Sequence, residues 1–402
     1  MNLTREQFLA LASELYDQEL SQKLNDKTQD FFEYESVFVQ TMQEFNRKTL
    51  EASLGALPTN PRKKKVMTHY GKVEIAESHE YSASVHGFRI SPHLQNLMTY
   101  LGSTETYSDA NCLINKFLNI EINSMQVHRV TNVHGDAMEN ALSEAEAEAL
   151  KSTVQPDEVV YGMIDGAMVL TREEGWKEVK TIRLFGSAAA LVVSESRRAL
   201  SASLYCSHLG TKDDFLEKVE PMTDVFDDLG ARFVFVTDGA KWIGNWVQST
   251  YPKATSILDV FHFLEHLNEW LLLEYKDSDA RKLIFNQYKE CVLTGGGTAL
   301  FSLVSAHTDR TKAAEEERKN LLKYLNNNLF RMDYPAYLAR GLFIGSGAIE
   351  SAQRTVLQQR LKLSGQRWTM DKAQNVLNLR TARLSNYWDK VITHIRTYKN
   401  TA

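Results

Sequence analysis

The sequence predicts an α/β protein in which one sheet is covered by helices on both faces. From residue 157 to residue 258, short apolar runs alternate with amphipathic segments of helical period. After residue 262 the apolar runs stop, and helical periodicity continues to about residue 340. Alternating strands and helices are typical of sheets that are buried on both faces. We therefore expect an α/β domain that carries a helical insertion.

The composition is that of an ordinary globular chain. It has 402 residues, 43% of them hydrophobic and 24% charged, which leaves room for two or three domains. No window reaches eighteen apolar residues and the start lacks a signal-peptide pattern, so we expect no membrane span. Cys112, Cys206 and Cys291 lie far apart, which fits a reducing cytoplasm. With a net charge of -5, any DNA binding depends on local basic patches.

The N-terminal part, residues 1–100, is predicted to be largely helical. Residues 1–55 form amphipathic helices in this interpretation, because Phe8, Leu9, Leu11 and Leu15 recur at helical spacing.

A proline-containing breaker at residues 58–61 precedes a basic run. This run is either a solvated loop or a contact with a DNA backbone. Its members are Arg62, Lys63, Lys64 and Lys65. A short strand is predicted directly after it, at residues 66–75.

Residues 101–150 predict a helix-turn-helix and a connector. Two apolar-periodic segments lie within residues 107–136, and Ser124 can cap the second one, which displays polar side chains. Helix pairs with short turns are common, so the pattern alone does not establish DNA binding. Residues 137–150 predict an acidic, solvated helix.

The α/β domain is expected at residues 151–385. The predicted strands are residues 158–164, 177–185, 202–208, 232–237 and 255–258. The predicted helices between them are residues 212–229 and 242–249.

Only helices are predicted beyond that point. The insertion covers about residues 263–340 and is broken at residues 295–297 and 333–335. Two arginine-rich helices follow at residues 347–362 and 369–398, and residues 386–402 form a C-terminal helix and tail.

Three carboxylates are placed where they could meet. Asp165 and Asp238 each follow an apolar run and precede a glycine, and Glu350 lies where a helix begins after glycines and Ser346. Ligands of parallel sheets bind at the carboxyl ends of strands. Carboxylates at one point repel each other unless cations lie between them, so the pattern predicts a two-metal site for phosphoryl transfer. An Asp-Gly pair after a strand is also common as a plain turn.

A second motif lies in residues 259–266. Asp259 and His262 would share one face of a helix. His262, Glu265 and His266 also match the H-x-x-E-H pattern of inverted zinc proteases, but no distant third ligand can be identified.

The C-terminal helices carry a basic strip beside an aromatic residue. Such a strip can hold phosphates and stack a base, although arginines on helices are often only solvated and Trp368 could instead fill the core. Its members are Arg354, Arg360, Lys362, Arg367, Arg380 and Arg383, next to Trp368.

Several segments, taken together and in this order, resemble the DDE transposases of bacterial insertion sequences of the ISKra type, which are related to Mutator-like elements. The resemblance covers about residues 100–385. The matching segments are residues 164–166, 175–180, 236–240 with Trp242 and Ile243, 259–262, 344–350 and 360–362. Residues 70–95 contain none of the paired cysteines that members often carry upstream.

The resemblance implies a ribonuclease-H-like fold with a helical insertion and a catalytic triad of Asp165, Asp238 and Glu350. By analogy with other two-metal sites, these residues would hold two Mg²⁺ or Mn²⁺ ions. His262 would contact the scissile phosphate or the leaving group, and Asp259 would orient it.

The expected activity is cutting DNA at the ends of a mobile element and joining them to target DNA, by a homodimer or higher oligomer. Two alternatives remain open at this point: a non-catalytic DNA-binding protein derived from a transposase, and a zinc metalloprotease.

Overall fold

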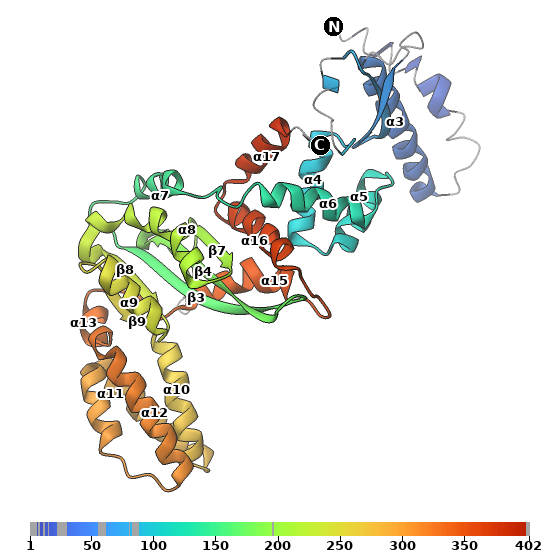
Figure 1. Ribbon diagram of the computed structural model, residues 1–402. Coiled ribbons are helices and arrows are strands. Elements are labelled where there is room, and N and C mark those ends of the chain that lie inside the picture. Colours follow the sequence, from blue (N-terminus) through green and yellow to red (C-terminus); the bar gives the residue numbers. More distant parts are fainter. Residues whose placement is uncertain are drawn as a thin grey trace. The chain divides into compact units, whose positions relative to one another are not determined.

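The computed structural model describes residues 6, 9–10, 13–14, 16–21, 30–54, 62–79, 81–82, 88–194 and 197–398. The chain divides into two compact units, which Figure 1 traces by colour. Unit 1 comprises residues 1–134 and 389–402, and unit 2 comprises residues 135–388. Within the described residues, no helix has the length and apolar character to cross a membrane.

Unit 1 begins with helices and a two-stranded hairpin. The described elements are η1 (Tyr16–Leu20), α3 (Phe31–Ser53), β1 (Lys63–Thr68) and β2 (Gly71–Ala76). The single strand predicted at residues 66–75 is wrong, because the chain reverses at Gly71, whose φ of 95° favours glycine. Of the apolar positions that predicted the first helices, Leu9 is exposed, and Phe8, Leu11 and Leu15 lie outside the described residues.

Three further helices form the main core of unit 1: α4 (Pro92–Thr104), α5 (Tyr107–Leu118) and α6 (Ser124–Asp136). The predicted helix pair at residues 107–136 is confirmed. Asn119 ends α5 in the left-handed conformation, which asparagine tolerates well. The Asn115 side chain exchanges hydrogen bonds of 2.9 and 3.0 Å with the backbone of Ile122, and this holds the turn between the two helices.

Unit 2 is built on a mixed five-stranded sheet with the order β7-β4-β3-β8-β9. Its strands are β3 (Val160–Thr171), β4 (Gly175–Gly186), β7 (Leu204–Leu209), β8 (Phe233–Thr237) and β9 (Thr255–Leu258). β4 pairs antiparallel with β3 and β7, whereas β8 pairs parallel with β3 and β9. The α/β class is confirmed. All five residues of β8 are buried, as expected for a strand covered on both faces.

The long β3–β4 hairpin departs from the predicted strand ends. β3 does not end before Asp165, because residues 166–171 continue to pair with β4. Its parallel pairing with β8 does end there, at the pair Ile164 and Thr237. The apolar run therefore corresponds only to the part of β3 that pairs with a neighbouring strand at each edge, β4 and β8. A second hairpin, β5 (Ala190–Ser194) and β6 (Arg197–Leu200), has no counterpart in the predicted elements.

Helices α7 (Glu144–Lys151), α8 (Lys212–Asp224) and α9 (Lys241–Thr250) complete the first part of unit 2. α7 is shorter than the predicted helix at residues 137–150. Nor is it fully solvated, since Glu146 is buried in a capping box with Ser143. Between α8 and β8 the chain forms a short 3₁₀ segment, η4 (Asp227–Arg232).

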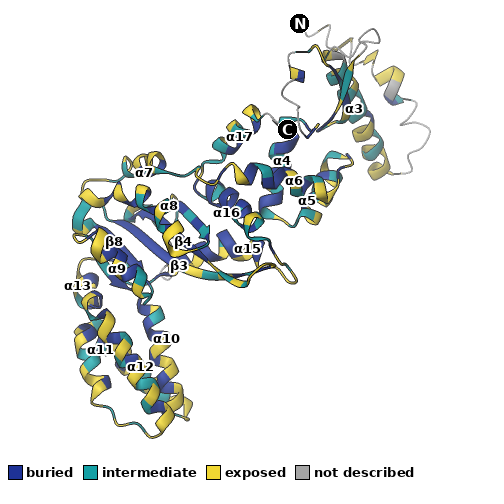
Figure 2. Ribbon diagram, in the orientation of Figure 1, coloured by how far each residue is buried: buried dark blue, intermediate teal, exposed yellow. Residues whose placement is uncertain are grey.

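The predicted helical insertion is present as consecutive helices. They are α10 (Val260–Glu274), α11 (Ser278–Ser305), α12 (Lys312–Asn328), η5 (Leu329–Arg331) and α13 (Tyr334–Ala339). Figure 2 shows exposed residues on the outer faces of α10 to α12, in contrast to the buried strands of the sheet. We call residues 260–339 the helical segment. The predicted break at residues 295–297 is confirmed, because Gly296 has a non-helical backbone conformation and α11 consists of two helical parts joined by a kink there.

The chain then returns to the sheet. α14 (Gly347–Gln353) contacts β3 and β4, and the π-helical turn η6 (Arg354–Gln358) leads into α15 (Gln359–Leu361). α16 (Met370–Leu384) packs on β7, and α17 (Trp388–Thr397) is separate from it, so the single helix predicted at residues 369–398 is interrupted.

Candidate active site

Three aspartates directly follow the residues at which the parallel pairing of three adjacent strands ends. The register pairs Ile164 of β3 with Thr237 of β8, and Thr237 with Leu258 of β9. Asp165, Asp238 and Asp259 come directly after these residues. Since neighbouring strands lie about 4.8 Å apart, this register brings the three residues to the same level of the sheet.

Two hydrogen bonds fix α14, the helix that carries Glu350, against β3 and β4. Gln353 donates from Nε2 to the Asp165 carbonyl at 2.9 Å, which joins α14 to β3. The buried Arg183 of β4 donates from Nη1 to the carbonyl of Ala348, in the first turn of the same helix, at 2.8 Å. Both contacts satisfy polar groups in a largely buried setting, where leaving them unpaired would be costly.

The loop before Glu350 is held by Asp259. This fully buried carboxylate accepts hydrogen bonds from the backbone N–H groups of Phe261, His262 and Ser346, and from the Ser346 hydroxyl. Ser346 Oγ also lies 3.0 Å from Glu350 Oε1. Since a serine hydroxyl has one proton, it donates to one of the two carboxylates at a time. Asp259 therefore connects the start of α10 with the loop that carries Glu350.

The pKa of Asp165 reflects the charged groups around it. Burial, together with the charges of Asp238 and Glu350, raises this pKa to about 6, although His262 and the backbone N–H of Gly166, which donates to Oδ1 at 2.8 Å, act in the opposite direction. The ionised form of Asp165 is thus less favourable than that of a free carboxyl, and nearby positive charge would favour it.

His262 lies beside this group at the start of α10. Its ring is half-exposed, with Nδ1 3.5 Å from Glu265 and Nε2 4.0 Å from Asp259. The latter distance is beyond a hydrogen bond, so the contact by which Asp259 was expected to orient the ring is not made. The structure places His262 near Asp165 and leaves Asp259 bonded to backbone and serine donors.

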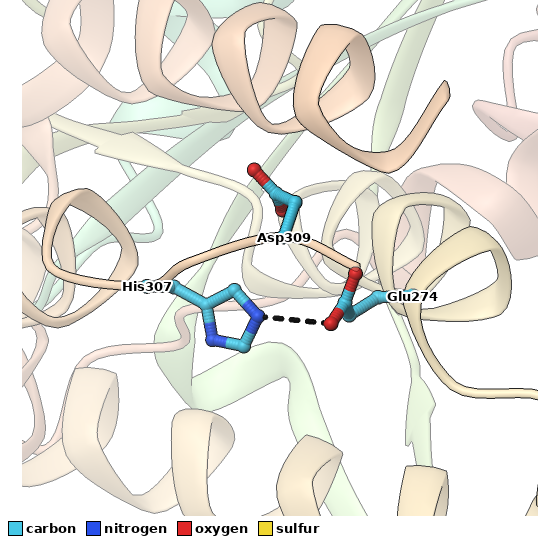
Figure 3. A group of neighbouring side chains, drawn as sticks. All are labelled: Glu274, His307 and Asp309. Carbon is cyan, nitrogen blue, oxygen red and sulfur yellow. Dashed lines mark hydrogen bonds and ion pairs between the residues drawn. The ribbon is translucent and has the colours of Figure 1, made fainter. Parts of the chain in front are cut away.

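A different cluster in the helical segment could hold a metal ion. Potential ligand atoms of Glu274, His307 and Asp309 all lie within 4.8 Å of one another, and within the described residues they form the only such group of three (Figure 3). Their oxygens already have donors: Arg310 and His307 at Glu274, and Trp270 and Arg318 at Asp309. Two arginines beside the carboxylates neutralise them without an ion.

The predicted triad of Asp165, Asp238 and Glu350 differs from this cluster. Among the described residues, these three carboxylates do not form a group in which one ligand atom of each lies within 4.8 Å of the others.

The predicted basic strip of the C-terminal helices is partly a core feature. Arg360 is 1% exposed, and its guanidinium stacks over the ring of Trp368 at 4.8 Å. Trp368 is also buried, and its indole N–H donates to the carbonyl of Leu361. Arg380 is buried as well and donates to the carbonyls of Thr355 and Val356 in the π-helical turn. The expectation that Arg360 and Trp368 contact DNA is therefore corrected.

Other members of the strip do reach the surface. Arg354, Lys362 and Arg367 are exposed. Arg367 lines a groove of about 560 Å³ together with Arg172, which follows the end of β3 and donates from Nε to the Arg367 carbonyl at 3.3 Å. Arg172 was not among the predicted site residues, because two glutamates follow it directly and it lies far from the strip in sequence.

The N-terminal basic run belongs to the start of β1 and is not a free loop. Arg62 and Lys65 are exposed. Lys63 pairs with Glu74 of the neighbouring strand at 3.3 Å, and Lys64 donates to the carbonyl of Ser82. Only part of this run therefore presents unshielded charge to a phosphate backbone.

The residues of the possible zinc-protease motif are engaged separately. His266 lies 3.2 Å from Glu269, and its ring packs on Tyr324. Within the described part of the chain, neither His262 nor His266 belongs to a group of three close potential ligands. Comparisons of the chain with protein-family models and with curated proteins give no match, so the function has to be argued from the site itself.

Proposed function

We propose that this protein is a DDE-type DNA transposase with a ribonuclease-H-like catalytic core. The observation that carries the proposal is the level arrangement of Asp165 and Asp238 after the pair Ile164 and Thr237, with Glu350 interacting from α14. The sheet order, three antiparallel strands followed by two parallel ones, supports this fold. The combined resemblance of the sequence segments supports the choice of a transposase within it.

The residues fit two divalent cations. Carboxylate oxygens are the ligands that Mg²⁺ and Mn²⁺ prefer. Burial and the neighbouring carboxylates disfavour the ionised form of Asp165, and bound cations would remove that penalty. Asp165 would hold both ions, with Asp238 and Glu350 each holding one. When bound, the ions supply an activated nucleophile and a stabilised leaving oxygen at phosphorus.

The chain's own groups would then position the DNA. His262 acts electrostatically on Asp165, and it would donate to a non-bridging oxygen or to the leaving group of the scissile phosphate. Asp259 and Ser346 would hold the Glu350 loop in place during the reaction. The exposed Arg354, Lys362 and Arg367 would bind the DNA backbone.

Arg62 and Lys65 in unit 1 are the corresponding candidates for a second DNA contact. The α5–α6 helix pair would read the element's terminal repeats. Both ends of an element must be processed together, so we propose that the active form is a homodimer or a higher oligomer.

The test is strand cleavage of a labelled duplex that carries the inverted repeats flanking the gene. We expect cutting by the wild type with Mg²⁺ or Mn²⁺, none in EDTA, and at least a 100-fold loss in Asp165→Asn, Asp238→Asn and Glu350→Gln. Each variant should still bind the duplex. Glu274→Gln is the matched control, because it alters the other cluster that could hold a metal and should cut normally.

Two outcomes would reject the proposal. Salt-sensitive binding of the duplex without metal-dependent cutting would indicate a DNA-binding protein without catalysis. Cutting that is lost in Glu274→Gln but retained in Asp238→Asn would move the metal site into the helical segment.

A further inference from the structure

A buried arginine of the helical segment lies directly behind Asp238. Arg331, at the end of η5, is 1% exposed. Its Nη1 donates to Thr237 Oγ1 at 2.8 Å, and its Nη2 donates to the Asp238 carbonyl at 2.6 Å. Asn328 Oδ1 accepts from Nε and Nη2 and fixes the guanidinium plane. The Arg331 side chain thus bonds to Thr237, the last residue of β8, and to Asp238, which follows it.

Among the described residues, the groups that accept hydrogen bonds from Arg331 are all neutral oxygens. A buried positive charge is costly unless acceptors or negative charge lie close by. Arg331 Nη2 bonds to the carbonyl of Asp238, and the carboxylate of the same residue acts electrostatically on the guanidinium.

Tyr324 of α12 adds a second contact from the same segment. A Cβ atom placed on Gly239 would lie 2.4 Å from Tyr324 Oη, so the turn after Asp238 fits closely against this ring. The hydroxyl is buried and has no hydrogen-bond partner among the described residues. The turn that presents Asp238 is therefore enclosed by the helical segment and cannot move independently of it.

We propose that Arg331 is a positioning residue that sets the orientation and metal affinity of Asp238, so that the helical segment is part of the active site and not an appendage to it. This inference rests on the proposed function, since it requires a metal at Asp238. Residues that bond to a metal ligand commonly change metal affinity by about 10–100-fold when they are replaced. Lysine at this position keeps the charge but cannot form the planar, forked set of hydrogen bonds.

The experiment measures Mn²⁺ binding by calorimetry without DNA, for Arg331→Lys, the wild type and a matched control. The control is Arg340→Lys, because Arg340, which directly follows the helical segment, also bonds to neighbouring elements, through the Ala231 carbonyl of η4 and Thr255 of β9, away from the carboxylates. We expect Arg331→Lys to weaken Mn²⁺ binding at least tenfold and Arg340→Lys to change it less than twofold. The Mg²⁺ concentration for half-maximal cleavage should rise similarly, with the maximal rate largely restored by excess metal.

Wild-type Mn²⁺ affinity in a folded Arg331→Lys variant would overturn the inference. So would parallel losses of melting temperature and maximal rate with an unchanged metal requirement, because these would make Arg331 a structural tie only. Failure of the proposed function looks different. In that case the wild type would bind Mn²⁺ no better than the Asp238→Asn variant does. The inference about Arg331 would then be rejected together with the proposed function.

A second pair of variants keeps the test decisive if Arg331→Lys does not fold. Thr237→Val removes the acceptor of Nη1 while keeping the shape of the side chain, and Thr237→Ser restores the hydroxyl. We expect a several-fold loss of Mn²⁺ affinity in Thr237→Val and recovery in Thr237→Ser. Equal affinities in these two variants would overturn the proposal.

Discussion

At the residue scale, three arginines of unit 2 serve the interior of the protein. Arg183, Arg331 and Arg380 are buried and donate to backbone carbonyls, at the start of α14, after β8 and in the π-helical turn respectively. The carbonyls that Arg331 and Arg380 bond lie where regular backbone bonding ends or is interrupted, after β8 and in the π-helical turn. A guanidinium offers five donors in one plane, so it can satisfy such groups where a hydrophobic side chain cannot.

Trp368 is expected to contribute to stability and not to DNA binding. Trp368→Ala removes a buried indole and its hydrogen bond to Leu361, and should lower the free energy of unfolding by about 3–5 kcal/mol. Chemical denaturation measures this loss, and a binding titration at a temperature where the variant is folded should show unchanged DNA affinity.

The exposed side chains of Lys362 and Arg367 are expected to contribute to DNA binding, in contrast to Trp368. Replacing both Lys362 and Arg367 by Ala should leave stability nearly unchanged and reduce the slope of log affinity against log salt by about two. Weakened DNA binding by the folded Trp368→Ala protein, or an unchanged salt slope in the double variant, would contradict this division of roles.

Because His134 is buried, we expect the stability of unit 1 to fall in acid. Burial, together with the charge of His394, lowers the pKa of His134 to about 3. The folded state therefore keeps a neutral imidazole while the unfolded state takes up a proton below about pH 6.5. This contribution to stability is complete above pH 6.5 and is lost as the pH falls toward 3. Between pH 7 and pH 5 the loss should be about 2 kcal/mol.

Urea denaturation of wild type and His134→Gln at both pH values measures this effect. Gln at this position does not titrate, so the variant should lose about 2 kcal/mol less than the wild type between pH 7 and pH 5. An equal loss in the two proteins would mean that other groups control the acid sensitivity.

At the element scale, α11 depends on a glycine in its interior. Gly296 has φ 73° and ψ -175°, a conformation that is essentially restricted to glycine. The next residue, Gly297, donates its N–H to the Met332 carbonyl at 2.9 Å, so the kink brings the backbone of α11 against the chain that follows η5. The kink therefore helps to place the end of the helical segment, including Arg331.

Gly296→Ala should destabilise the protein by at least about 1–3 kcal/mol, since the new Cβ would also lie 3.3 Å from the Met332 carbonyl. Thermal unfolding measures the change. Thr298→Ala, at an exposed position of the same helix, serves as the control and should be neutral or slightly stabilising. An equally small effect of both substitutions would show that α11 tolerates a regular helical path here.

At the scale of the whole molecule, each unit has its own hydrophobic core. One hydrophobic cluster of unit 2 gathers residues between Ala147 and Tyr387, and one of unit 1 gathers residues between Met67 and Val133 together with Tyr398. A part of a chain that contains its own core can in principle fold alone.

A fragment of residues 135–388 should therefore unfold cooperatively and bind Mn²⁺ with an affinity that Asp238→Asn removes. Circular dichroism and calorimetry on the isolated fragment measure both properties. A fragment without a cooperative transition would contradict the independence of the units.

The sequence by itself determined the elements that local pattern controls. Apolar runs located the sheet strands. Three of these runs are followed directly by an aspartate, and the register places Asp165, Asp238 and Asp259 at one level of the sheet. This succeeds because a strand covered on both faces must be apolar along its covered length. The helix pair around Asn119 and the helical segment were likewise readable from periodicity and breakers.

Only the tertiary structure decided which arginines are buried and which lie at the surface. Arg360 and Arg367 are seven residues apart in one basic strip, yet the first stacks on Trp368 and the second is exposed. Arg331 gave no signal, because its partners Thr237 and Asp238 lie more than ninety positions earlier in the chain. A charged side chain is buried where distant backbone leaves acceptors unsatisfied, and that depends on how elements pack and not on local pattern.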